Sequence, residues 1–153
     1  MTLTLNKKNK KMEEVYLYFR TVSTDGADDA KADSCCFPLS AFSGMQFSST
    51  GGVNIVKLSF RSMLNNYGYD EAASSEITSD RVAINLKSTA TAREFRRDFN
   101  EAIDSAKMKL RGKFLVIGDD NAEALNDDGT AGTQYFSATV DNISAIEIAG
   151  IVS

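Results

Sequence analysis

Histidine, the side chain that most often serves in acid–base catalysis and zinc coordination, is absent from this sequence. Its absence excludes Ser-His-Asp and Cys-His nucleophile systems, histidine zinc sites and a histidine-based pH switch. Cys35 and Cys36 are adjacent, which differs from the C-x-x-C spacing of zinc and redox sites. We interpret them as a buried pair of small apolar side chains beside Phe37. We therefore expect neither a catalytic site nor enzymatic activity.

Acidic residues gather in the segment 119–129, where calcium binding is the chemistry to consider. An EF-hand loop requires glycine at its sixth position and glutamate at its twelfth. Counted from Asp119, these positions hold Ala124 and Thr130. We interpret the segment as a solvated acidic loop and predict neither a metal nor a cofactor. Carboxylate pairs elsewhere are possible acid–base groups, but the sequence selects no single pair.

Positive charge is concentrated at the N-terminus, although the net charge of the chain is −4. The residues from 1 to 11 include no acid, and their lysines are Lys7, Lys8, Lys10 and Lys11. Such an arm on an acidic body is either a solvated tail or a segment that docks on an acidic surface. That surface would belong to a neighbouring subunit or to nucleic acid, so the four lysines are candidate partner-binding residues.

Length and composition fit one domain of ordinary size. We predict a basic N-terminal arm at 1–12 and a single domain at 13–153. The sequence has no apolar run of roughly 18 residues, so we expect no membrane-spanning helix. Its first residues do not combine a charged start with an apolar stretch, so we also expect no secretory leader.

The first predicted strand, 15–20, alternates between two kinds of side chain. Its apolar residues on one face are Val15, Leu17 and Phe19. Tyr16 and Tyr18 lie on the opposite face, and tyrosine is enriched at protein interfaces. We therefore treat this tyrosine pair as a second group of candidate partner-binding residues.

Further strands are predicted from the same alternation at 53–61 and 81–87, with two short strands within 35–47. Gly51-Gly52 predicts the turn of a β-hairpin. Phe114 to Ile117 is a continuous apolar run, which predicts a central strand covered on both faces.

The last strands are predicted at 135–140 and 144–148, separated by a turn at Asp141-Asn142.

A helix is predicted at about 91–110, because Thr91 and Glu94 fit a capping box. Apolar side chains then recur every three or four residues, at Phe95, Phe99, Ala102, Ile103, Ala106 and Leu110. Gly112 is expected to end this helix. The basic residues Arg93, Arg96 and Arg97 lie mostly off the apolar stripe, and we interpret them as the exposed side of the helix. Together the elements predict an α+β fold: a largely antiparallel sheet with one main amphipathic helix packed on one face.

Several segments of the chain resemble small virion structural proteins of tailed marine bacteriophages, of the capsid decoration or cement type. The segments are VYLYFRT at 15–21, FPLSAF at 37–42, VAINLK at 82–87 and KFLVIGDD at 113–120, together with the helix that holds Phe95 and Phe99. The similarity spans most of residues 13–149. It lies in the hydrophobic pattern, so no individual functional residue is carried over.

The resemblance implies a subunit that binds and stabilises a shell of major capsid protein. It further implies a homo-oligomer that assembles in the host cytoplasm and resides in the virion. A tail or head–tail connector subunit is one alternative. A nucleic-acid-binding accessory protein that uses the lysine arm is another, although the acidic body makes nucleic acid the less expected partner. A hydrolase with two close carboxylates is the last.

Overall fold

The computed structural model describes residues 14–21, 30, 33–62, 79–109, 113–121 and 131–148. The elements in chain order are β1 (Tyr16–Arg20), β2 (Ser34–Pro38), the 3-10 turn η2 (Leu39–Ala41), β3 (Phe42–Thr50), β4 (Val53–Arg61), β5 (Ser79–Leu86), α1 (Ala92–Met108), β6 (Phe114–Asp119), β7 (Gln134–Tyr135) and β8 (Val140–Glu147). The mixed α+β class predicted from the sequence is confirmed. None of the helices in the described ranges has the length and hydrophobicity of a membrane span.

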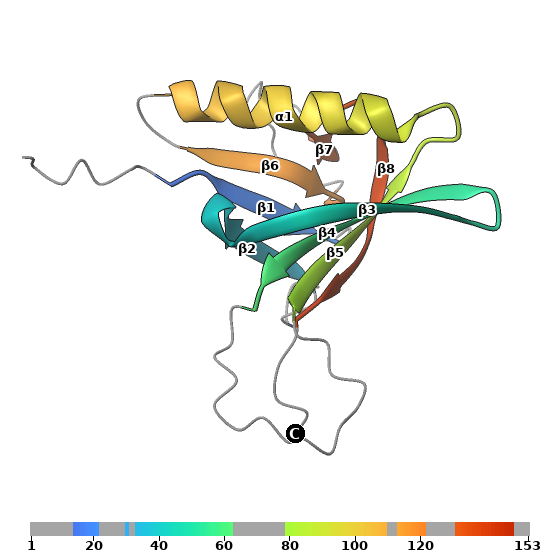
Figure 1. Ribbon diagram of the computed structural model, residues 1–153, viewed down its shortest axis with the longest axis horizontal. Helices are drawn as coiled ribbons and strands as arrows, with labels where there is room; N and C mark the ends of the chain where they lie inside the picture. The colour runs from blue at the N-terminus through green and yellow to red at the C-terminus, as the bar shows by residue number, and fades with distance from the viewer. Residues whose placement is uncertain are drawn as a thin grey trace, which may run out of the picture.

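The strands form two four-stranded sheets, where the sequence analysis expected one. Sheet A has the order β2-β1-β6-β7 and sheet B the order β3-β4-β5-β8 (Figure 1). Every paired neighbour is antiparallel except β1 and β6, which run parallel. Alternation fixes which face of a strand is buried but does not identify its neighbour, so the division into two sheets could not be read from the pattern.

The hairpin and the helix lie where the sequence placed them. Thr50 pairs with Val53 across Gly51 and Gly52, whose φ angles of 60° and 82° suit a turn with two left-handed residues. At the start of α1, the Thr91 hydroxyl accepts a hydrogen bond from the Glu94 N–H at 3.2 Å. The Glu94 carboxylate accepts the Thr91 N–H at 3.0 Å, which completes the predicted capping box. Gly112 lies outside the described residues.

The prediction was wrong near the C-terminus. The strand expected at 135–140 is limited to the two residues of β7, and the turn expected at Asp141-Asn142 lies inside β8. Asn142 is level with Asn85 on β5, and the Asn85 amide donates a hydrogen bond to the Asn142 side-chain oxygen at 3.2 Å. Two register shifts in this pair absorb the irregular spacing. A cross-strand partner for the asparagine therefore outweighs its local preference for a turn.

Phenylalanine side chains join both sheets and the helix into one core. Phe60 stacks on Phe37 with ring centroids 4.2 Å apart. It also meets the edge of Phe19 at 5.9 Å and of Phe42 at 5.7 Å. The network continues through Phe42 to the helix and takes in Phe47, Phe95, Phe99 and Phe136.

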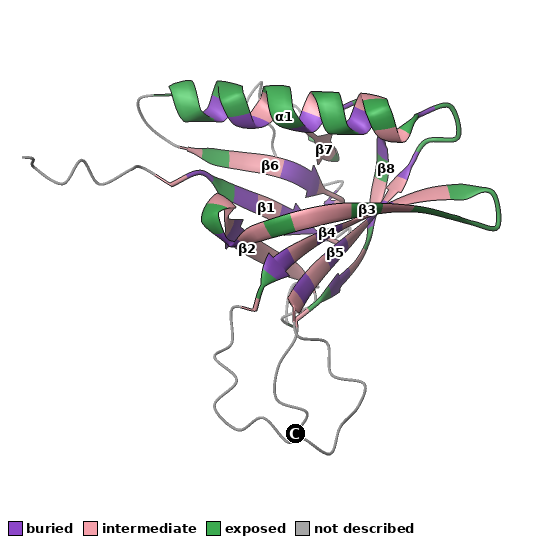
Figure 2. Ribbon diagram, in the orientation of Figure 1, coloured by how far each residue is buried: buried purple, intermediate pink, exposed green. Residues whose placement is uncertain are grey.

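The side of α1 that faces the strands is buried and the opposite side is exposed (Figure 2). Eight of the nine phenylalanines thus hold the elements together, and Phe114 lies apart.

Candidate functional site

The outer face of sheet A carries a group of large apolar side chains. Tyr16 is level with Pro38 on one neighbouring strand and with Phe114 on the other. In the next row, Tyr18 is level with Cys36 and Val116. Residues level with one another across strands point to the same side of a sheet. We call this surface the aromatic face, and its residues are Tyr16, Tyr18, Cys36, Pro38, Phe114 and Val116.

Two of the rings on the aromatic face are open to solvent. Tyr16 is 46% exposed and Phe114 is 49% exposed. The Tyr18 ring, half-buried, packs against Phe114 with centroids 5.3 Å apart and planes tilted by 38°. A tilted aromatic pair at this distance is favourable, so the rings hold one another in place. The surface is therefore apolar, and two of its three rings keep about half of their area in contact with water.

These rings face outward because the residues that alternate with them along β1 are buried in the core. Val15, Leu17 and Phe19 alternate with the tyrosines along the chain, and all three are at most 2% exposed. A strand with its odd-numbered residues in the core must point its even-numbered residues away from it. The predicted tyrosine face is thus confirmed as outward, with Tyr16 exposed and Tyr18 covered in part by Phe114.

The sequence analysis missed that Phe114 and Val116 belong to this face. The apolar run from Phe114 to Ile117 was expected to be covered on both sides, yet Phe114 is 49% exposed and Val116 is only half-buried. Ile117 is fully buried, at a register shift between β1 and β6. A parallel pairing between such distant segments leaves no local mark in the sequence, so only the continuous apolar run could have hinted at it.

A buried ion pair borders the aromatic face at the end of β1. Arg20 is level with Asp119 on β6, and the guanidinium lies 4.0 Å from the carboxylate. Their side chains are only 11% and 15% exposed. The Asp119 carboxylate also accepts the Asn121 N–H at 2.9 Å. The pair neutralises its own charges, so the aromatic face itself carries no net charge.

The cysteines are not the buried pair that the sequence predicted. Because neighbours on a strand face opposite ways, Cys35 packs against the core while Cys36 joins the aromatic face. Burial, with the nearby Cys36 and Asp80, raises the pKa of Cys35 to about 12, and burial also raises the pKa of Cys36. Both thiols stay protonated at neutral pH, which makes them poor nucleophiles and poor metal ligands.

Carboxylates at the junction of the two sheets are engaged in structural contacts. Asp120 accepts the Tyr135 hydroxyl at 2.6 Å and the Ile143 N–H at 3.1 Å, which ties sheet A to β8 of sheet B. Burial raises the pKa of Asp120 and, together with the Asp120 hydrogen bond, the pKa of Tyr135. Over the described part of the chain no three or more acidic, cysteine or histidine residues are grouped to hold a metal. Most of the acidic segment 119–129 lies outside it.

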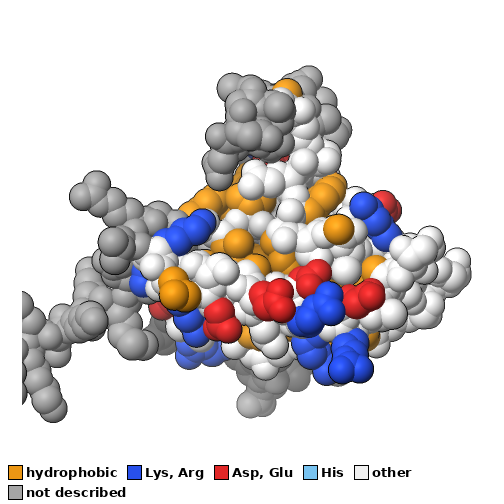
Figure 3. Space-filling view, turned by 90° about the horizontal axis from the view of Figure 1, so that it is seen from above, with side chains coloured by type: hydrophobic (Ala, Val, Ile, Leu, Met, Phe, Trp, Pro, Cys, Tyr) orange, Lys and Arg blue, Asp and Glu red, His pale blue; other side chains and the backbone are white. Residues whose placement is uncertain are grey.

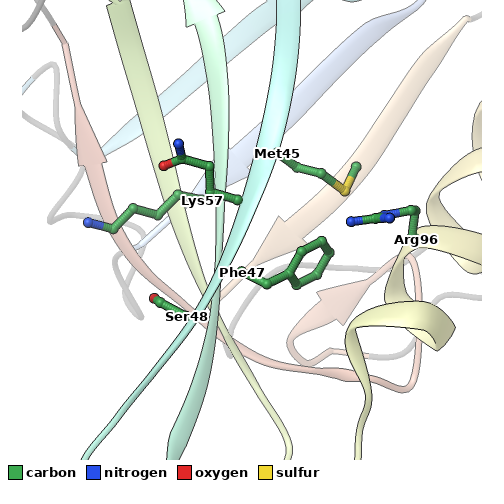
Figure 4. Close-up of a pocket in the computed structure, with 6 residues that line it drawn as sticks. Met45, Phe47, Ser48, Lys57 and Arg96 are labelled. Carbon is green, nitrogen blue, oxygen red and sulfur yellow. The ribbon is translucent and has the colours of Figure 1, made fainter.

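Two open hollows adjoin β3, and none of the described residues that line them is Asp or Glu. The larger is formed by Met45, Gln46, Phe47, Ser48, Lys57 and Arg96. The Phe47 ring and the Met45 sulfur point towards Arg96, whereas Lys57 points to the other side of β3 (Figure 4). The Arg96 guanidinium lies 4.9 Å from the centroid of the Phe47 ring, a cation–π contact.

The predicted arginine patch is divided among separate contacts. Arg96 covers Phe47, while Arg97 pairs with Asp98 at 3.3 Å. Seen from the side of α1, acidic and basic side chains are interspersed over the surface, and hydrophobic side chains appear beside them (Figure 3). The helix therefore does not present the continuous positive stripe that nucleic acid requires. The lysine arm, Lys7 to Lys11, lies outside the described residues.

No family model, curated protein sequence or solved structure matches this chain. Its function has to be inferred from the chemistry of its surfaces, and the aromatic face carries two of the four large hydrophobic side chains that are exposed among the described residues, Tyr16 and Phe114.

Proposed function

We propose that this protein is a virion structural subunit of a tailed phage, and that it binds and stabilises the major capsid protein shell as a decoration or cement protein. The observation that carries the proposal is the pair of half-exposed rings, Tyr16 and Phe114, side by side on a rigid strand pair. Aromatic side chains that are already ordered lose little conformational freedom when a partner covers them. The resemblance of the hydrophobic pattern to virion structural proteins supplies the class of partner.

The chemistry of the aromatic face suits a flat and mostly apolar protein surface. It offers the hydroxyl group of the exposed Tyr16, and the charges of Arg20 and Asp119 at its border are paired with one another. A partner therefore gains little from charge and most from covering the rings. Six side chains make a small contact, so one subunit would bind weakly. A homo-oligomer on a symmetric shell repeats the contact and multiplies its strength.

The test is co-sedimentation with empty tailed-phage capsids that lack a decoration protein, and separately with random duplex DNA, across a salt series. We expect saturable capsid binding that changes little with salt, since the aromatic face is neutral. Tyr16→Ala and Phe114→Ala should each weaken it by about tenfold, as loss of a buried aromatic anchor does. Val53→Ala is the matched control: Val53 is 41% exposed but lies at the β3–β4 hairpin, so its loss should leave binding unchanged.

Other results would redirect the proposal. Steeply salt-dependent DNA binding without capsid binding, lost when residues 1–11 are deleted, would favour the nucleic-acid accessory protein instead. Rings or tubes of the purified protein in electron micrographs, again without capsid binding, would favour a tail or connector subunit. Equal loss of capsid binding in Val53→Ala and Phe114→Ala would show that the aromatic face is not the contact.

A further inference from the structure

The two sheets differ in how their outermost strands are protected from pairing with another chain. An edge strand presents unpaired N–H and C=O groups, and proteins usually block it with charges, proline, bulges or a short length. In sheet A, β2 has five residues and ends in Pro38. In sheet B, β8 carries Asp141 and Glu147, and the Asp120 carboxylate already accepts its Ile143 N–H. These edges are blocked.

The other edge of sheet B, strand β3, has none of these protections along most of its length. Its nine residues include no charged residue and no proline, and its one register shift lies at the start, between Phe42 and Gly44. From Met45 to Thr50 the strand is regular, and within the described part of the chain it pairs only with β4. Counted from the two-residue turn, the antiparallel ladder directs the backbone groups of Met45, Phe47 and Ser49 to the open side.

Charges beside this edge have a single sign. Lys57, level with Gln46, lies on one face of the sheet, and Arg96 lies on the other, above Phe47 (Figure 4). Over the part of the chain that the structure describes, no Asp or Glu lines either hollow beside β3. An added strand would therefore meet a cation on each of its faces. A second copy of β3 would add two more cations to an edge that already has two, so charge disfavours self-pairing and favours an acidic strand.

We propose that the open edge of β3 is a strand-addition site for an extended acidic segment of another protein, which becomes the fifth strand of sheet B. Backbone hydrogen bonds to Met45, Phe47 and Ser49 supply the alignment, as in β-augmentation. Alternate side chains of the segment point towards the hollow beside Met45 and Phe47, where an acidic one draws the Arg96 guanidinium into an ion pair. This site is separate from the aromatic face, and capsid binding can fail without affecting it.

The test uses the full chain, labelled with nitrogen-15, and a capped synthetic seven-residue peptide that alternates valine and glutamate. Titration should shift the amide signals of Met45, Phe47 and Ser49 saturably and leave those of Tyr16 and Tyr18 unchanged. The same peptide with lysine in place of glutamate should bind at least about tenfold more weakly, because its charges then lie on the face of Arg96 and repel it.

Two pairs of variants test the backbone hydrogen bonds and the charge interaction separately. Ser49→Pro removes an N–H on the open side and should abolish binding, whereas Ser49→Thr keeps that N–H and should bind normally. Arg96→Ala should weaken the glutamate peptide by about threefold to tenfold, in line with the loss of one charge-assisted contact. Arg93→Ala removes an exposed arginine of the same helix that lines neither hollow, and should change nothing.

Three outcomes would overturn the proposal. Equal binding of the glutamate and lysine peptides would show that the site does not select an acidic segment. Amide shifts confined to residues outside β3 would show that the peptide does not bind at this edge. Shifts in β3 that grow with protein concentration in the absence of peptide would show that a second copy occupies the edge. Should Ser49→Pro fail to fold, the two peptides and the two arginine variants still decide between these results.

Discussion

The outer faces of the two sheets occupy equivalent positions on the same core but have opposite chemistry. Sheet A presents the aromatic face. The outer face of sheet B, which we call the polar face, carries Gln46, Ser48, Ile55, Lys57, Ser59, Arg81, Ala83, Asn85, Asn142 and Ala145. Most of these side chains can form hydrogen bonds with water, whereas contact between water and the rings of sheet A is unfavourable. The polar face shows that the outer face of a sheet in this fold can be solvated, so the apolar side chains of sheet A are not a requirement of packing on the shared core.

The comparison also shows where stability resides. In both sheets, the residues that face inward are almost completely buried, such as Phe19 in sheet A and Phe60 in sheet B. Substitutions on the outer faces should therefore change capsid binding far more than they change the free energy of unfolding. Four substitutions test that separation, in order of decreasing expected effect.

Phe60→Ala should disrupt both faces together. Phe60 is fully buried and its ring contacts three others across the two sheets. Removing such a side chain costs about 3–5 kcal/mol through lost burial and the cavity left behind. Urea unfolding should show that decrease in the free energy of unfolding. A cost below about 1 kcal/mol, the value expected for an exposed phenylalanine, would mean that the aromatic core does not hold the sheets together.

Phe114→Ala makes the same chemical change on the aromatic face, with a smaller effect on folding. Phe114 is half-exposed and its ring contacts Tyr18, so its loss should lower the free energy of unfolding by about 1 kcal/mol. The capsid affinity should still fall by about tenfold. If the free energy of unfolding decreased as much as in Phe60→Ala, the Phe114 ring would be required for folding. The aromatic face would then not be a separate binding surface.

Asp120→Asn tests the link between the two sheets through its pH dependence. Burial raises the pKa of Asp120 above its ordinary value of 3.8, so the folded protein retains a proton that the unfolded chain releases. The free energy of unfolding therefore falls as pH rises from about 3.8 through the folded pKa. Asparagine cannot titrate, yet its side-chain oxygen still accepts from Tyr135 and Ile143. Relative to the wild type, the variant should gain stability across that window, as measured by urea midpoints at several pH values. A constant difference would contradict the assignment.

Asn85→Ala should have the smallest effect, because it lies on the polar face. It removes the hydrogen bond to Asn142, where water can take the place of the lost amide, so we expect a cost of about 0.5 kcal/mol. Capsid binding should equal that of the wild type. Loss of capsid binding in this variant, measured in the same co-sedimentation assay, would assign the contact to sheet B and reverse the comparison.

Local signals in the sequence predicted the elements that depend on local physics. Thr91 and Glu94 marked the start of the helix, Gly51 and Gly52 the hairpin, and alternation the inward set Val15, Leu17 and Phe19. Features that depend on distant pairing were missed. Nothing near Phe114 indicates that it will lie level with Tyr16, and nothing near Asn142 indicates that Asn85 will compete for its side chain.

The candidate site was consequently found only in part. The two tyrosines were identified from their own strand, but the residues that complete the aromatic face come from β2 and β6. The open edge of β3 likewise depends on sheet order, which the order of residues does not specify. The lysine arm stays a prediction.

The parallel pairing of β1 with β6 also constrains how the chain reaches its fold. The two strands are separated by about a hundred residues, and contacts over such distances slow folding because a long loop must close before any stabilisation results. During synthesis, β1 can pair with β2 early but must wait for the helix and β6 to emerge from the ribosome. Until then β1 lacks one of its two neighbours in sheet A, and Tyr18 lacks the ring of Phe114 that packs against it in the finished fold.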